Sequence, residues 1–149
     1  MDINEIKEIE TAIGFKFGNK RLLETAFTTP AFANQNKNQN SGARVESGDR
    51  LEFLGDGILK YILTHKLYMS GKKTAGQMTE ERQDYERFET HAAIIDRLDI
   101  AKYLRLVDKQ TVSDKMKSDL YEAVIGAIYV DKRGGIKAVR RLVEKTLFN

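Results

Sequence analysis

The chain has 149 residues, enough for one domain (residues 1–149) with its own hydrophobic core and too few for two domains of ordinary size. It has no cysteine and no apolar run near the roughly 18 residues that cross a bilayer, which excludes disulfides, thiolate metal sites and membrane spans and favours a cytoplasmic protein. The net charge of +3, from 25 basic and 22 acidic residues, is too small to indicate nucleic-acid binding by itself.

Apolar residues recur at helical spacing almost throughout, so we expect an all-α domain of roughly seven or eight helices. The first predicted helix spans Ile3–Ile13 and ends at Gly14, a natural C-terminal cap. A short second helix begins after Asn19, an N-cap residue, and ends or bends at Pro30, the only proline. The last predicted helix covers Ile136–Phe148.

One segment of low complexity interrupts the helical pattern. Residues Asn34–Gly42 are rich in asparagine and glutamine and have no apolar anchor, which predicts a solvated loop. Further along, Asp99–Arg105 is expected to form a short helix or a turn.

The next helical pattern, from Asp49 to about Tyr68, places acidic residues on one face. Asp49, Glu52 and Asp56 recur at steps of three and four residues. Glu52 and Asp56 are like charges one turn apart, which costs a helix about 0.2–0.5 kcal/mol, and their apolar neighbours reduce their solvation. A divalent cation with oxygen ligands would supply the missing positive charge. From this stretch alone, a solvated acidic face is the favoured interpretation, and an ordinary ion pair between Asp56 and Lys60 is also open.

The glycines and histidines that follow are interpreted as structural residues. Gly55 and Gly57 each lower helix propensity by about 1 kcal/mol relative to alanine, which indicates close helix–helix packing. One helical pattern runs from about Ala75 or Gln77 to Leu98. His65 and His91, the two histidines of the chain, lie outside the acidic groups, so we expect partly exposed helix residues and not bases or ligands.

A second acidic helix is predicted to begin at Ser113 or Asp114. It carries Asp119 and Glu122 on one face of a strongly apolar run, with Lys115 one turn before Asp119. Two such helices in one small domain indicate four carboxylates that converge between facing helices, as in the metal sites of helical bundles. Four oxygen donors without cysteine or a nearby histidine favour Mg²⁺ or Mn²⁺ over zinc.

At these residues the chain resembles the ribonuclease III family. Asp49–Asp56 is similar to the family signature E-R-L-E-F-L-G-D, and Asp119–Asp131 is similar to its second block, D-x-x-E-A-x-x-G-A-x-Y-x-D. Ile9–Ala26 resembles the family's N-terminal helices, and Ala101–Leu106 resembles the segment just before the second block. The resemblance covers nearly the whole chain.

Two positions depart from the family pattern. Asp49 replaces a glutamate with a shorter acid, and Ala75 stands where the motif E-G-x-L-[TS] has glutamate, a secondary member of the family's acidic cluster. The alanine puts the outer part of that cluster in doubt, and Glu80 or Glu81 is a candidate to compensate.

The resemblance implies the ribonuclease III endonuclease fold, a homodimer, and Mg²⁺-dependent cleavage of double-stranded RNA into 5′-phosphate and 3′-hydroxyl ends with short 3′ overhangs, Mn²⁺ serving as a substitute. It assigns four metal-facing, catalytic acids: Glu52, Asp56, Asp119 and Glu122. Glu122 is expected nearest the catalytic metal, and Asp49 at the rim of the site. Phe53 would insert into a pocket of the partner subunit, the alternative being an ordinary core aromatic.

Four carboxylates around one or two Mg²⁺ ions can carry out phosphodiester hydrolysis on general physical grounds. One ion lowers the pKa of a bound water to make a nucleophile, and a second stabilises the leaving 3′-oxygen. Lys115 and Lys37 are candidate RNA contacts, with ordinary exposed lysines as the alternative. Typical relatives continue into a double-stranded-RNA-binding domain, whereas this chain stops at Asn149. A truncated chain and a natural single-domain form are both open, and a partner protein that supplies RNA affinity is a candidate interaction.

Two competing hypotheses remain at this point. The first is a catalytically inactive ribonuclease III fold that binds RNA or a partner protein; such subunits usually lose a metal-facing acid, and this chain keeps all four. The second is an unrelated helical metal-binding or structural protein with accidental acidic pairs, which the four matching segments disfavour.

Overall fold

The computed structural model describes residues 1–37, 45–71 and 73–149. In these ranges the chain forms eight α-helices and one short 3-10 helix, which confirms the expected all-α fold. The helices are α1 (Ile3–Ile13), α2 (Lys20–Ala26), α3 (Pro30–Asn36), α4 (Asp49–Met69), α5 (Ala75–Glu86), α6 (Phe88–Leu98), α7 (Asp114–Val130) and α8 (Ile136–Leu147), with the 3-10 helix η1 (Ala101–Tyr103) before α7. None of the described helices combines the length and apolar composition needed to cross a bilayer.

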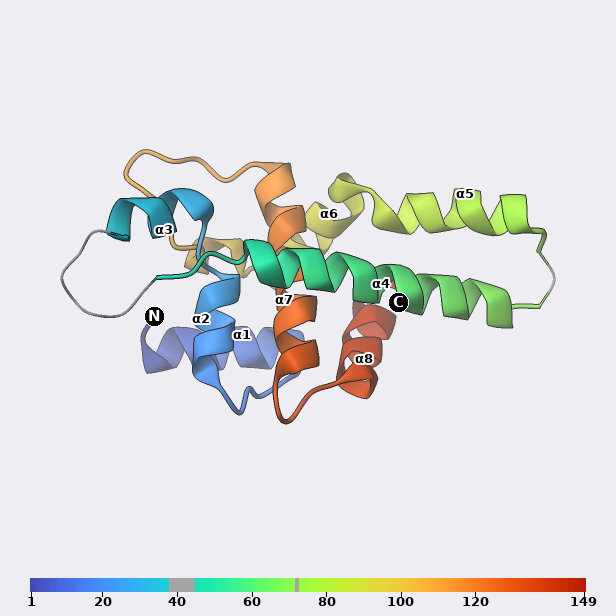
Figure 1. Cartoon of the computed structure of the whole chain (residues 1–149), viewed down its shortest axis with the longest axis horizontal. Coiled ribbons are helices and arrows are strands. Elements are labelled where there is room, and N and C mark those ends of the chain that lie inside the picture. Colours follow the sequence, from blue (N-terminus) through green and yellow to red (C-terminus); the bar gives the residue numbers. More distant parts are fainter. Residues whose placement is uncertain (38–44, 72) are drawn as a thin grey trace.

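Helix α7 is the centre of the domain, and α4 crosses it (Figure 1). It packs against α4, α6, α2 and α8. Between Leu120 and Ile128 every residue except Glu122 is buried. A helix that is apolar on almost all sides must be enclosed by other elements, and this composition explains why α7 lies in the core. The same burial places the carboxylate of Glu122 at the edge of that core.

The crossing of α4 and α7 depends on two glycines that let the backbones touch. A Cβ atom added at Gly55 would lie 1.7 Å from the carbonyl oxygen of Glu122, and one added at Gly126 would lie 2.1 Å from that of Leu51. The packing role predicted for Gly55 is therefore confirmed. The same prediction for Gly57 is wrong, because an added Cβ there would meet no described atom within 4 Å.

The end of α7 is fixed to the N-terminal part of the chain by Asp131, the last residue of the second family block. Its carboxylate accepts backbone N–H groups from Gly18 and Asn19, each at 2.9 Å, and from Arg133 at 3.0 Å. Burial alone would raise the pKa of Asp131, but the three hydrogen bonds outweigh it and lower the pKa. This acid therefore has a structural role.

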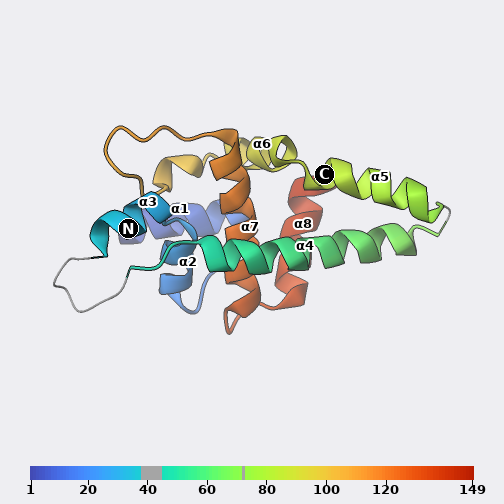
Figure 2. The ribbon, with the colours of Figure 1, turned by 45° about the horizontal axis from the view of Figure 1, so that its top comes forward.

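Helix α5 and the second half of α4 form a hairpin that extends from the body of the domain (Figures 1 and 2). Helix α5 has no buried residue, and it begins with a capping box formed by Thr74 and Gln77. Arg82 Nη1 donates to Thr64 Oγ1 at 2.9 Å, which joins the two helices. Polar contacts and caps, and little apolar burial, hold this hairpin together.

The single helix predicted from Ala75 to Leu98 is wrong, because the chain breaks at Arg87. Arg87 has an extended backbone (φ −64°, ψ 139°) that ends α5 and starts α6. Two α6 side chains replace the lost helical bonds: Thr90 Oγ1 donates to the Asp84 carbonyl at 3.0 Å, and His91 Nε2 lies 2.7 Å from the Tyr85 carbonyl. The break allows α6 to bury its apolar face against α7 while α5 follows α4.

Pro30 begins a helix instead of only ending one. Thr29 caps α3 by accepting the N–H of Phe32 at 3.3 Å, and Pro30 occupies the first turn, where its missing N–H costs nothing. The loop predicted for Asn34–Gly42 is therefore wrong at Asn34–Asn36, which are helical. Lys37 is exposed at the end of α3, and residues 38–42 lie outside the described part of the chain.

Replacing Gly55 by alanine tests the helix crossing. We expect Gly55→Ala to lower the free energy of unfolding by more than about 2 kcal/mol, because the new methyl group meets rigid backbone and not a movable side chain. Urea denaturation followed by circular dichroism measures the change. The control is Gly76→Ala in α5, where the nearest described atom would be Thr74 Oγ1 at 3.9 Å; we expect a change below about 1 kcal/mol. Equal stability of the two variants would contradict the proposed crossing.

Candidate active site

The α4–α7 crossing brings the four predicted metal-facing acids to one place. Glu52 and Asp56 lie on either side of Gly55 on α4, and the carbonyl that Gly55 approaches belongs to Glu122 on α7. Asp119 lies one turn before Glu122 and forms a hydrogen bond with Glu52 across the two helices. The convergence of acids from two facing helices, inferred from their spacing, is therefore present in the structure.

Like charges and burial act together on this acidic cluster, defined as Glu52, Asp56, Asp119 and Glu122. Burial, followed by the negative charges of the other three acids, raises the pKa of Glu122 to about 7. Burial, followed by the charge and hydrogen bond of Asp119, raises the pKa of Glu52 to about 7 as well. Near neutral pH, Glu52 and Glu122 are therefore partly protonated, because too little positive charge lies nearby to balance the four carboxylates.

Lys115 is the basic side chain that directly contacts the acidic cluster. Its ammonium pairs with Asp119 Oδ1 one turn along α7, and this hydrogen bond raises the pKa of Lys115. The shared helix face predicted for the two residues is confirmed. The Lys115 side chain remains 65% exposed, so its charge only partly compensates the acids and stays accessible from outside.

His91 is buried beside Glu122, which makes the interpretation of a partly exposed residue outside the acidic groups wrong. The ring has no exposed surface, and Nδ1 lies 3.7 Å from Glu122 Oε1. Burial lowers its pKa, so the ring is neutral near pH 7. The sequence spacing could have indicated that His91 is buried, because His91 lies on the apolar face of α6 together with Ala92 and Ile95. His65, by contrast, is exposed on α4.

The remaining predicted residues lie around the cluster. Asp49 is exposed in the first turn of α4, and its charge contributes to the raised pKa of Glu52. Ala75 and Glu80 are exposed on α5, and Glu81 pairs with Lys73 at the start of that helix.

A groove beside Glu122 shows which acid of α5 comes near the cluster. Glu86, at the end of α5, lines this groove together with Glu122 and Lys115. No sequence pattern singles out Glu86, because its position depends on the break at Arg87.

The donor set of the cluster fits a hard cation. All four side chains offer carboxylate oxygens, the ligands that Mg²⁺ and Mn²⁺ prefer. Among the residues that the structure describes, no three histidine, aspartate or glutamate side chains adopt a geometry that would hold an ion. In the present arrangement Asp119 instead bonds Glu52 and Lys115. The mutually raised pKa values show that the cluster lacks a positive charge, which a divalent cation would provide.

Comparison with known proteins agrees with this arrangement. The family model described as "Ribonuclease III domain" matches residues 49–133, which include both acidic helices. The chain belongs to this family. It is 34% identical over 145 residues to ribonuclease 3 of Streptococcus equi subsp. zooepidemicus, an alignment that covers 93% of the chain and 60% of that protein. It is 30% identical over 151 residues to ribonuclease 3 of Clostridium tetani, with 97% and 61% covered.

The fold is also similar to that of a solved ribonuclease III domain. The nuclease domain of ribonuclease III from Campylobacter jejuni superposes with a TM-score of 0.81 at 25% sequence identity, covering 97% of this chain and 99% of that one. The chain thus spans about 60% of the length of the curated ribonuclease III relatives and nearly all of the solved nuclease domain.

The raised pKa values predict how stability depends on pH. Because Glu52 and Glu122 have folded-state pKa values near 7, above their ordinary 4.5, the folded protein binds more protons than the unfolded chain between these values. The stability contributed by their protonation is therefore complete below about pH 4.5 and is lost as the pH rises through 7. We expect a loss of about 1–3 kcal/mol in chelator-containing buffer, less than two independent shifts would give.

Urea denaturation at a series of pH values measures this loss. The variant Glu122→Gln should flatten the pH dependence, whereas Glu80→Gln, at an exposed position on α5, should leave it as in the wild type. A wild-type stability that rises between pH 5 and 7 to the same extent in all three proteins would contradict the electrostatic interpretation.

Proposed function

We propose that this chain is a ribonuclease III-type endoribonuclease domain that hydrolyses double-stranded RNA with Mg²⁺, or with Mn²⁺ as a substitute, in the cytoplasm. The products would be 5′-phosphate and 3′-hydroxyl ends with short 3′ overhangs. The observation that carries the proposal is the acidic cluster at the α4–α7 crossing, formed by the four acids of the family motifs that the resemblance assigns to the metal. The match to ribonuclease III relatives over 93–97% of the chain supports it.

The four acids of the cluster would hold the metal, with Glu122 nearest the reaction. A divalent cation bound there supplies a water of lowered pKa and a positive charge opposite the phosphate. The chain itself contributes the fixed spacing of the acids and a partly buried environment that strengthens their electrostatic interactions. Asp49, exposed at the rim, is suited to orienting water or substrate.

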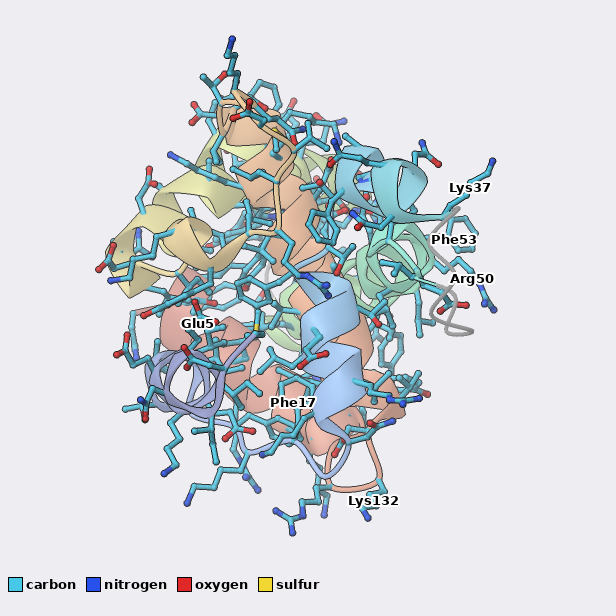
Figure 3. All side chains as sticks on the ribbon, turned by 90° about the vertical axis from the view of Figure 1, so that its left-hand side faces the viewer. Glu5, Phe17, Lys37, Arg50, Phe53 and Lys132 are labelled. Atoms are coloured by element: carbon cyan, nitrogen blue, oxygen red, sulfur yellow. The ribbon has the colours of Figure 1, made fainter. Side chains whose placement is uncertain are left out.

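Two lysines are suited to contact the RNA backbone. Lys115 is 65% exposed beside the acids, so its ammonium can exchange Asp119 for a substrate phosphate. Lys37 is exposed at the end of α3, and Figure 3 shows its side chain extending from the molecule on the same side as Arg50 and Phe53. Contacts of this kind read the shape and charge of a duplex and not its sequence.

We also propose a homodimer held by Phe53. This side chain is 85% exposed in the middle of the catalytic motif, so the alternative of an ordinary core aromatic is wrong (Figure 3). Beside it lies a groove lined by Tyr61, Tyr129 and Ile136. A large exposed aromatic next to an apolar groove is typical of a protein interface. The Campylobacter jejuni nuclease domain has a region involved in dimer formation, which agrees with this proposal.

Cleavage of a long, perfectly paired RNA duplex tests the activity. With Mg²⁺ present we expect cleavage by the wild type and a rate more than about 100-fold lower for Glu122→Gln, which keeps the size of the side chain and removes its charge. The matched control is Glu144→Gln on α8, where the glutamate pairs with Lys66, and its rate should equal that of the wild type. Binding of the duplex without cleavage by wild type would instead favour an inactive RNA-binding subunit.

Sedimentation velocity tests the dimer. We expect Phe53→Ala to weaken dimerisation by at least about 2 kcal/mol, or about 30-fold in the dissociation constant, because a central aromatic anchor is lost. Ile3→Ala is the control, since Ile3 is 67% exposed on α1, away from the groove. A wild type that stays monomeric at high concentration would contradict the proposed dimer.

A further inference from the structure

We propose that His91, acting through Ser118, is a positioning residue that keeps the carboxylate of Glu122 free of protein hydrogen-bond donors so that it can bind a cation. This inference rests on the proposed function, since it assigns a task to groups behind the acidic cluster. His91 is fully buried on α6, and Ser118 is buried on α7 one turn before Glu122.

The hydrogen bonds of the ring fix the tautomer of the neutral imidazole. Nε2 lies 2.7 Å from the Tyr85 carbonyl oxygen, which can only accept, so Nε2 carries the hydrogen. The neutral ring then has a lone pair on Nδ1, which lies 3.1 Å from Ser118 Oγ and accepts the serine hydroxyl hydrogen. Both ring nitrogens are satisfied inside the protein, so the ring neither binds a metal nor transfers a proton.

This arrangement decides what Glu122 meets on its buried side. Nδ1 is 3.7 Å from Glu122 Oε1 but presents a lone pair, so the ring fills space without donating a hydrogen bond. The Ser118 hydroxyl, the other nearby donor, is already committed to Nδ1. Among the described residues, no hydrogen bond is donated to the Glu122 carboxylate, whose oxygens therefore remain available toward the groove that it lines.

The same ring connects the cluster to the α5–α6 break. Its bond to the Tyr85 carbonyl caps the end of α5, and its ring packs against Tyr121 of α7 with centroids 5.0 Å apart. Glu86, the next residue after Tyr85, lines the groove beside Glu122. His91 thus sets both the inner wall behind Glu122 and the position of the α5 terminus that borders its groove.

Mn²⁺ binding measured by electron paramagnetic resonance tests this role independently of cleavage. In His91→Phe the aromatic volume is kept, but Ser118 is released and can donate to Glu122. We expect its Mn²⁺ dissociation constant to be about ten-fold weaker than that of the wild type. His91→Gln keeps one donor and one acceptor and should stay within about three-fold of the wild type. The double variant His91→Phe/Ser118→Ala removes the released hydroxyl and should bind Mn²⁺ more tightly than His91→Phe.

The outcomes separate this role from a merely structural one. A lower melting temperature of His91→Phe with unchanged Mn²⁺ affinity would overturn the inference, and so would a double variant that binds no better than the single one. If His91→Phe fails to fold, His91→Gln carries the test, and a ten-fold loss of Mn²⁺ affinity in that variant would overturn it. Wild-type protein that neither binds Mn²⁺ nor cleaves RNA would overturn the proposed function and this inference together.

Discussion

The backbone contact between α4 and α7 determines the rest of this structure. Gly55 and Gly126 allow two helices to approach until carbonyl oxygens of one helix lie where a side chain of the other would begin. At that distance, the acids nearest the crossing, Glu52 and Asp56 on α4 and Asp119 and Glu122 on α7, are brought together. The acidic cluster is therefore a consequence of helix packing, and any residue larger than glycine at the crossing would separate the four carboxylates.

The cluster opposes folding, and the apolar helix α7 offsets this cost. Burial and mutual repulsion raise the pKa values of Glu52 and Glu122 to about 7, so charge at neutral pH is unfavourable in the folded state. The apolar residues of α7 on either side are buried against four other helices and hold the acids in place. Stability stored in the core thus maintains a site that is poised to bind positive charge.

Much of this was predictable from the sequence where the signal is local. The end of α1 and the start of α7 follow from the capping residues Gly14 and Ser113. Such a signal depends only on a few residues next to the helix end. The break at Arg87 carries no glycine or proline and arises because α6 packs on α7. Gly55 and Gly57 look alike in sequence, yet residues two apart on a helix point about 200° away from each other, so only one can face α7.

The alanine at position 75 illustrates how geometry reinterprets a departure from the family motif. Helix α5 has 12 residues, so its first residue lies about 17 Å along the axis from its last. Its last residue, Glu86, borders the groove beside Glu122, whereas Ala75 is exposed at the opposite end. An acid at position 75 would lie too far along the hairpin to join the cluster of its own subunit. Ala75 therefore leaves that cluster intact. The missing carboxylate can change only contacts made at the outer end of α5, where Ala75 is exposed.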